Sequence, residues 1–313
     1  MQYGFGVDLG GTTVKIAYFD EFGNMLNKWE IPTDRSENGK NILPDIAKSV
    51  KEYIKLEGVS KKDLVGIGIG VPGAVLPDGT VNKCVNLGWG VFNIEKELST
   101  LTNLPVKAGN DATVAAMGEC WKGGGQGCKN MVFATLGTGV GGGIVVDGKV
   151  IHGVHGAGGE IGHLVLNRDE TEVCGCGKKG CVEQYCSATG IVRIAKKHLE
   201  AVCEASSLRA LENMTCKDIF DAGAAGDQVA LEILEQVYRY LGEFLANVCC
   251  VTDPEVIVLG GGVSKAGQPL LEGAKRYYQK FVFHAAKDTR IELATLGNDA
   301  GAYGAFKLVL DNA

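Results

Sequence analysis

Residues 3–19, YGFGVDLGGTTVKIAYF, decide the fold. Apolar runs flank a glycine turn, which predicts a strand, a tight turn and a second strand. The turn consists of Gly10, Gly11, Thr12 and Thr13. Its backbone N–H groups and hydroxyls suit an anion, and Asp8, at the end of the first strand, suits a magnesium ion held with a phosphate. A simple β-hairpin explains this stretch alone equally well.

Residues 131–148, MVFATLGTGVGGGIVVDG, repeat this design. The turn of the second copy consists of Gly137, Thr138 and Gly139. Aligning the two copies places Thr135 opposite Asp8, so the second copy keeps the loop and lacks the carboxylate. Two such hairpins in successive segments indicate an internal duplication. We expect its halves to face each other across a ligand cleft, with one loop holding a phosphate from each side.

Length and composition suit a globular protein of two domains. The chain has 313 residues, of which 45% are hydrophobic and 22% are charged. A net charge of −6 argues against a general binder of nucleic acid or anionic membranes. No apolar run approaches the roughly 18 residues of a spanning helix, and the first strand leaves no room for a signal peptide. The eleven cysteines are therefore interpreted as reduced thiols of a cytoplasmic protein.

Residues 158–187, GGEIGHLVLNRDETEVCGCGKKGCVEQYCS, form a metal-binding pattern that core packing does not explain. Cys174, Cys176 and Cys181 follow the spacing C-x-C-x4-C, and His163 lies eleven residues upstream of the first. Three thiolates and one imidazole are a common ligand set of closed, structural zinc sites. A disulfide or three unrelated buried thiols are the alternatives. A disulfide is disfavoured because Cys174 and Cys176 are too close for relaxed bridging geometry.

Residues 105–121, PVKAGNDATVAAMGECW, predict a short strand, Asn110 and Asp111, and then a helix. An N-cap is the commonest reason for an aspartate at such a junction, and the local sequence favours that role for Asp111. The functional alternative is a general base at the carboxyl end of a strand. A second Asn-Asp-Ala at 298–300 also lies between a strand and a helix. If Asp111 is catalytic, Asp299 should not be interchangeable with it.

The rest of the chain alternates between helical and strand patterns. Helices are expected at 41–57, 187–202, 208–222 and 227–251, and strands at 64–71 and 256–259. The strand at 256–259 is closed by Gly260, Gly261 and Gly262, which either admits a ligand to the backbone or only makes a tight turn. Trp89 either lines a pocket or fills a gap. A domain boundary near 118–128 is expected to be a hinge.

Six segments together resemble the ROK family of bacterial sugar kinases and related repressors, within the actin-like, ribonuclease H-like ATPase superfamily. They are DLGGTTVK at 8–15, GNDA at 109–112, LGTGVGGGIVVDG at 136–148, GEIGH at 159–163, CGCGKKGCVE at 174–183 and VLGGGVS at 258–264. The resemblance implies two α/β domains around a deep cleft, with the C-terminal helix returning to the first domain. The expected domains are 1–118 plus 300–313, and 119–299.

The resemblance also implies roles for the residues singled out above. The glycine hairpins would hold the phosphates of ATP, and 260–262 would lie near the adenosine. Asp111 would take the proton from the sugar hydroxyl, which replaces the local preference for a cap, although both roles can coexist. The residues expected to bind sugar hydroxyls are Asn110, Glu160, His163 and Glu183. His163 would offer one ring nitrogen to zinc and the other to the sugar.

The implied activity is that of an ATP-dependent kinase, most like the ROK glucokinases, which phosphorylates the 6-hydroxyl of glucose. The implied cofactors are ATP, Mg²⁺ and a structural Zn²⁺, and the implied assembly is a homodimer. N-acetylmannosamine, N-acetylglucosamine, mannose or fructose are alternative substrates. A sugar-responsive repressor is a more distant alternative. Such repressors carry a helix-turn-helix domain ahead of the first glycine hairpin, which here begins at the N-terminus of an acidic chain.

Overall fold

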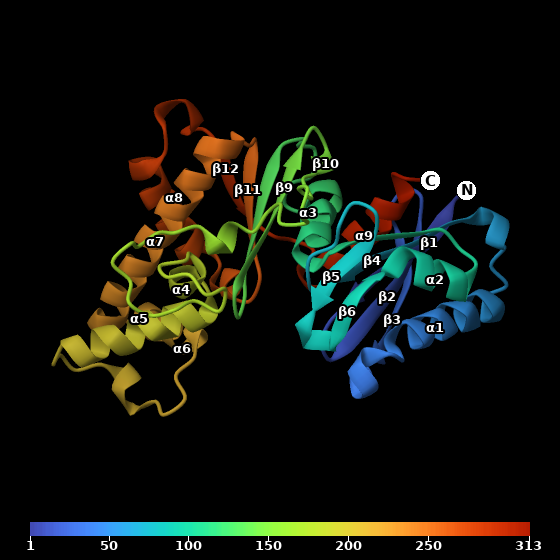
Figure 1. Ribbon diagram of the computed structural model, residues 1–313. Coiled ribbons are helices and arrows are strands. Elements are labelled where there is room, and N and C mark those ends of the chain that lie inside the picture. The colour runs from blue at the N-terminus through green and yellow to red at the C-terminus, as the bar shows by residue number, and fades with distance from the viewer. The chain divides into compact units, whose positions relative to one another are not determined.

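The computed structural model describes residues 1–313, apart from the side chains of residues 83 and 85. The chain forms two compact units, each with strands and helices (Figure 1), so the predicted α/β class is confirmed. The first unit is Met1–Lys129, Gly143–Gly159 and Thr295–Ala313, and the second is Asn130–Gly142 and Glu160–Ala294. The division into 1–118 plus 300–313 and 119–299 stays a prediction.

The first unit is built on a five-stranded sheet of order β3-β2-β1-β4-β7. Its strands are β1 (Tyr3–Leu9), β2 (Thr13–Asp20), β3 (Met25–Pro32), β4 (Leu64–Val71) and β7 (Val106–Asn110). β1 and β2 form the predicted hairpin, with Asp8 opposite Lys15. β4 runs parallel to β1 and β7 parallel to β4. Asp8 and Asn110 therefore lie at the same carboxyl edge of the sheet, where α/β proteins place their ligands.

Four helices and a separate hairpin complete the first unit. They are α1 (Ile42–Leu56), α2 (Ile94–Thr102), α3 (Asp111–Lys122), α9 (Ala300–Leu310), β5 (Thr80–Cys84) and β6 (Trp89–Asn93). α9 packs against α3, β1 and β4, as Figure 1 lets the reader follow. The crossing of α3 and α9 is unusually close, because a Cβ atom on Gly304 would lie 1.5 Å from the Val114 carbonyl oxygen and one on Gly118 would lie 2.2 Å from the Ala300 carbonyl oxygen.

The second unit contains parallel strands and a layer of helices. A second sheet has the order β10-β9-β8-β11-β12. Its strands are β8 (Met131–Leu136), β9 (Val140–Val146), β10 (Lys149–Val150), β11 (Val256–Gly260) and β12 (Arg290–Leu293), of which β10 and the end of β9 belong to the first unit. Along β9 the chain passes from Gly142 of the second unit to Gly143 of the first. The helices are α4 (Glu183–Cys186), α5 (Ala188–Ala201), α6 (Cys216–Ala224), α7 (Gln228–Thr252) and α8 (Gln268–Phe281).

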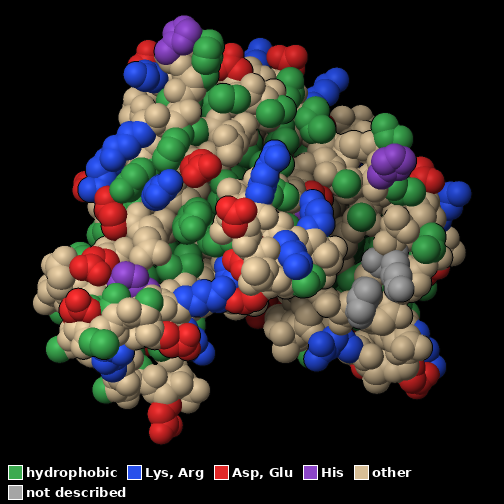
Figure 2. Space-filling model, turned by 60° about the vertical axis from the view of Figure 1, so that its left-hand side comes forward, with side chains coloured by type: hydrophobic (Ala, Val, Ile, Leu, Met, Phe, Trp, Pro, Cys, Tyr) green, Lys and Arg blue, Asp and Glu red, His purple; other side chains and the backbone are tan. Residues whose placement is uncertain are grey.

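Short 3₁₀ segments connect many of these elements. They are Ser36–Gly39, Lys61–Asp63, Val85–Leu87, Ile161–His163, Ser207–Ala210, Val263–Ala266, His284–Ala286 and Gly297–Asp299. Among the described residues, no helix combines the length and the apolar character needed to cross a membrane. On the face shown in Figure 2, acidic and basic side chains are interspersed and form no stripe of one sign.

The predicted helices and strands are confirmed with one exception. The helix predicted at 208–222 is wrong in its first half, because α6 begins only at Cys216. A capping box explains this start: the Thr215 hydroxyl accepts a hydrogen bond from the Asp218 amide, and the Asp218 carboxylate accepts one from the Thr215 amide. Helical periodicity alone does not reveal such a boundary.

The α3–α9 crossing makes Gly304 a sensitive position. The change Gly304→Ala forces the two helix backbones apart, and we expect it to lower the free energy of unfolding by about 3 kcal/mol, the upper range for overpacking. Urea titration followed by tryptophan fluorescence measures this, since Trp29, Trp89 and Trp121 all lie in the first unit. Gly90→Ala is the control, because nothing lies within 4 Å of a Cβ atom there. Equal midpoints for both variants would contradict the expectation.

Candidate functional site

The glycine loop of the first unit has a closed side and an open side. Gly10 closes the turn: its N–H donates to the Thr13 carbonyl at 3.0 Å, and its carbonyl accepts from the Thr33 hydroxyl at 2.8 Å. Nothing lies within 4 Å of a Cβ atom on Gly11, and Thr12 is exposed. Of the four predicted loop residues, Gly11 and Thr12 are therefore the ones that leave room for a phosphate.

Asp8 lies beside this loop in a strongly charged setting. The Lys15 ammonium is 3.8 Å from an Asp8 carboxylate oxygen and donates to the Asn298 carbonyl at 3.2 Å. Burial raises the pKa of Asp8, Lys15 acts in the opposite sense, and the charges of Asp111 and Asp299 add to the increase. A divalent cation beside Asp8 would offset this negative charge, so the Asp8 carboxylate suits the predicted magnesium. Lys15 was not predicted, although its register opposite Asp8 in the hairpin is a usable signal.

Asn110, and not Asp111, caps α3. The Asn110 side-chain oxygen accepts from the amides of Ala112 at 3.0 Å and Thr113 at 3.2 Å, and its side-chain nitrogen donates to the Gly73 carbonyl at 3.1 Å. The local sequence favoured Asp111 as the N-cap, and this prediction is wrong, because the cap is the preceding residue, Asn110. Asp111 is the first residue of the helix, where it is exposed and accepts from the Ala112 amide at 2.8 Å. Its role as a base stays a prediction.

The second Asn-Asp-Ala makes different contacts. Asp299 stands at the N-cap position of α9, but its side chain makes no capping hydrogen bond. Its carboxylate instead accepts from the Lys28 ammonium at 3.0 and 2.9 Å. The two aspartates therefore differ in their surroundings as well as in their helices.

The glycine loop of the second unit is closed in a related way. The Gly137 N–H donates to the Gly139 carbonyl at 2.9 Å, and the Thr138 carbonyl accepts from the Thr189 hydroxyl at 2.7 Å. Glu183 braces this loop, because its carboxylate accepts from the Val140 amide at 3.0 Å and would lie 2.2 Å from a Cβ atom on Gly139. The sequence suggested Glu183 only as a sugar ligand, since nothing local points to a loop more than forty residues away.

The four predicted zinc ligands come together. The ligand atoms of His163, Cys174, Cys176 and Cys181 all lie within 4.8 Å of one another. The sulfur atoms of Cys176 and Cys181 are 3.6 Å apart, and the Cys174 sulfur is 3.9 Å from His163 Nδ1. Ligands of a tetrahedral zinc ion are separated by about 3.7 Å, so this set fits the metal. All three cysteines are free, which removes the disulfide alternative.

The three thiols of this cluster differ in their surroundings. Burial raises the pKa of Cys174 and, to about 12, that of Cys181, whereas the Lys178 backbone N–H lowers the pKa of Cys176. Thiols of this kind become thiolates when a metal binds. His163 directs Nδ1 toward the sulfurs and Nε2 toward Glu160, 3.8 Å away.

Gly262 lines a cavity of about 460 Å³ in the second unit. Other lining residues are Ala188, Thr215, Phe220, Val263 and Lys265. Gly261 supports the turn with φ of +85°, and a Cβ atom there would lie 2.5 Å from the Leu136 carbonyl oxygen, so only glycine fits. A cavity with an aromatic wall beside the open backbone of Gly262 suits a flat base, and the placement of 260–262 near the adenosine stays a prediction.

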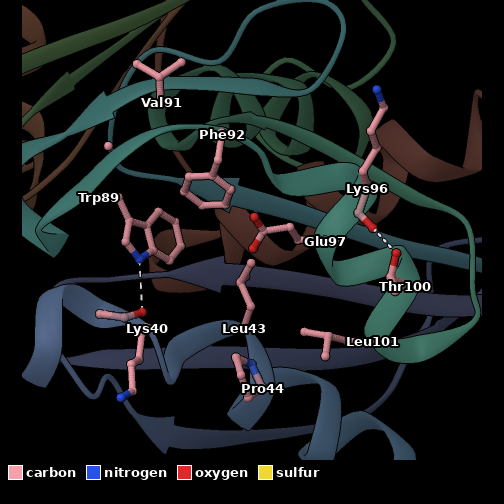
Figure 3. A pocket seen from close by; sticks show the side chains of 12 residues that line it. Lys40, Leu43, Pro44, Trp89, Val91, Phe92, Lys96, Glu97, Thr100 and Leu101 are labelled. Carbon is pink, nitrogen blue, oxygen red and sulfur yellow. Dashed lines mark hydrogen bonds between the residues drawn. The ribbon is translucent and has the colours of Figure 1, made fainter.

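A cavity of about 690 Å³ lies elsewhere, in the first unit (Figure 3). Its walls include Leu43, Pro44, Trp89, Phe92 and Leu101, and none of the predicted site residues lines it. Trp89 both lines this cavity and fills a gap, since it is 7% exposed and its indole N–H donates to the Gly39 carbonyl at 3.0 Å. Volume alone therefore does not locate the predicted chemistry.

The predicted residues thus fall into two groups. Those of the first unit are Asp8, Gly10, Gly11, Thr12, Thr13, Asn110 and Asp111, and those of the second are Gly137, Thr138, Gly139, Glu160, His163, Cys174, Cys176, Cys181, Glu183, Gly260, Gly261 and Gly262. Their roles stay predictions. Besides Lys15, the buried Glu119 was not predicted, although a glutamate among small apolar residues of a helix is a recognisable signal.

Comparison with known proteins identifies the family. Residues 4–312 match the model of the ROK family. The chain is 44% identical to a glucokinase of Halalkalibacterium halodurans, over 97% of this chain and 94% of the relative. It is 29% identical to a xylose repressor of Caldicellulosiruptor bescii, over 98% of this chain and 78% of the relative. A solved ROK family glucokinase from Streptomyces griseus, in complex with glucose and AMPPNP, is 32% identical, with a TM-score of 0.77 and 98% of each chain covered. As the motifs predicted, the chain belongs to the ROK family.

Proposed function

We propose that this chain is an ATP-dependent glucokinase, which transfers the γ-phosphoryl group of ATP to the 6-hydroxyl of glucose. The observation that carries the proposal is the exposed Asp111 carboxylate at the carboxyl edge of the sheet that also holds Asp8 and the open Gly11 loop. The similarity to glucokinases over nearly the whole chain supports glucose as the acceptor.

Phosphoryl transfer requires the protein to align the reacting groups and to neutralise the charge of the phosphates. Asp111 takes the proton from the sugar hydroxyl while the hydroxyl oxygen attacks the γ-phosphorus of ATP, and ADP leaves. The open side of each glycine loop holds phosphate oxygens, and the cavity beside Gly262 takes the adenosine. Asp8 would hold a magnesium ion or its waters, and that ion supplies positive charge to the phosphates.

Sugar recognition is assigned to the second unit and to Asn110. Glu160 and Glu183 accept hydrogen bonds from sugar hydroxyls, and His163 adds a third contact through Nε2. His163, Cys174, Cys176 and Cys181 would hold the zinc ion, and a metal on the ring would fix the tautomer and the orientation of His163. The metal would therefore be structural, and only His163 would link it to the sugar. We further propose that the enzyme is cytoplasmic and that it forms a homodimer. Light scattering of the purified protein tests the homodimer.

A panel of sugars tests the substrate. ADP release is measured with glucose, N-acetylmannosamine, N-acetylglucosamine, mannose and fructose, and we expect glucose to give the highest kcat/KM. A much higher value for another sugar would replace glucose as the substrate. The repressor alternative predicts no turnover and sequence-specific retention of DNA, which a gel-shift experiment measures.

Asp111→Asn tests the base. Loss of a general base lowers turnover by at least about 100-fold, and we expect that loss in kcat while glucose binding, measured by calorimetry, weakens only moderately. Asp299→Asn is the matched control, because that carboxylate pairs with Lys28. It should retain most of the turnover. Equal losses of kcat in the two variants would show that Asp111 is not the base.

Elemental analysis tests the zinc site. Protein purified without added metal should contain about one zinc per chain, the stoichiometry of a closed four-ligand site. Cys181→Ser removes a buried ligand and should reduce the content to background, with a lower melting temperature. Cys203→Ser changes an exposed cysteine outside the cluster and should keep the metal. A metal-free enzyme with full activity would refute the site.

A further inference from the structure

Glu119, near the end of α3, is a carboxylate with no exposed surface. It accepts three hydrogen bonds from backbone amides: Gly124 at 2.8 Å, Thr295 at 3.1 Å and Leu296 at 3.0 Å. Burying a carboxylate is costly unless several donors stabilise its charge. Its helix is otherwise made largely of small or apolar residues, so packing alone does not explain a glutamate at this position.

The three donors belong to stretches that are far apart in the sequence. Gly124 follows α3 and precedes the point, after Lys129, where the chain leaves the first unit. Thr295 and Leu296 begin the stretch where the chain returns to that unit for the last time. The Glu119 carboxylate therefore accepts hydrogen bonds from both segments: the one where the chain leaves the first unit and the one where it returns.

The returning segment leads directly to the charged groups beside the first glycine loop. Two residues beyond Leu296, the Asn298 carbonyl accepts a hydrogen bond from Lys15 at 3.2 Å. Further on, Gly301 lies so close to Asp8 that a Cβ atom there would be 2.7 Å from the carboxylate carbon. Any displacement of 295–301 therefore disturbs the partners of both Lys15 and Asp8.

Asp111 is the first residue of the helix that carries Glu119, about two turns away. We propose that Glu119 is a positioning residue for phosphoryl transfer: it fixes the segment 295–301 against α3, and so fixes Asp8 and Lys15 relative to Asp111. This inference rests on the proposed kinase function. Glu160, His163 and Glu183, which are assigned to the sugar, belong to the other unit and make none of these contacts.

Glu119→Gln tests this role with little change of shape. The amide nitrogen cannot accept a hydrogen bond, so at least one of the three backbone donors loses its partner. We expect kcat to fall about tenfold, while the KM for glucose stays within twofold and the zinc content is unchanged. Hydrogen exchange of the Thr295 and Leu296 amides should accelerate.

Asp20→Asn is the matched control. Asp20 is 7% exposed, lies in the same unit, and accepts from the backbone amides of Phe22 and Asn24 at 3.0 and 2.9 Å in the turn after β2. This variant should lose stability and keep kcat. Equal values of kcat in Glu119→Gln and Asp20→Asn would overturn the proposal. A raised KM for glucose at unchanged kcat would overturn it as well.

If Glu119→Gln does not fold, hydrogen exchange in the unaltered protein tests the proposal instead. Slow exchange at Gly124, Thr295 and Leu296 supports the hydrogen bonds from these amides to Glu119. Exchange as fast as that of exposed amides overturns the proposal. Exchange does not depend on turnover. An unaltered protein that phosphorylates no sugar would therefore contradict the proposed function. The exchange rates of these amides would still show whether Glu119 holds the segment 295–301.

Discussion

The first unit depends on direct contact between backbones. α9 approaches β1, β4 and α3 so closely that side chains are excluded from the contact. A Cβ atom on Gly6 would lie 2.0 Å from the Ala302 carbonyl oxygen, and one on Gly68 would lie 1.6 Å from that of Ala305. Interiors packed at this density transmit small displacements instead of absorbing them. The sheet edge that holds Asp8 and the helix that begins with Asp111 are therefore fixed by the same few glycines.

Local sequence predicts much of this molecule. The two glycine hairpins, the zinc ligands and most helices depend on periodicity, turn chemistry and ligand spacing within a few tens of residues. The errors arise where a side chain acts over a short distance that propensity does not resolve. Asn110 caps α3 because its oxygen reaches two amides, one residue before the expected cap. Thr215 and Asp218 start α6 in the middle of a segment whose periodicity predicts one longer helix.

Long-range contacts were beyond sequence reasoning for a different reason. Glu119 accepts from amides that lie 176 and 177 residues further along the chain. Glu183 braces a loop 43 residues before it. Neither contact leaves a local pattern, because the donors are backbone amides and every residue except proline has one. An acid in an apolar stretch, such as Glu119, can be recognised in the sequence, but its role can be assigned only when its partners are known.

The arrangement of the chain also affects how the first unit is made. Its last stretch, Thr295–Ala313, contains α9, which packs against β1 and β4. The ribosome synthesises α9 more than two hundred residues after β1 (Tyr3–Leu9) and β4 (Leu64–Val71), the strands that it covers. Until α9 leaves the exit tunnel, Phe19 and Val65, which pack against Phe306 and its neighbours in α9, have no permanent cover. The nascent protein thus carries an unfinished core through most of its synthesis, a state that cells protect with chaperones.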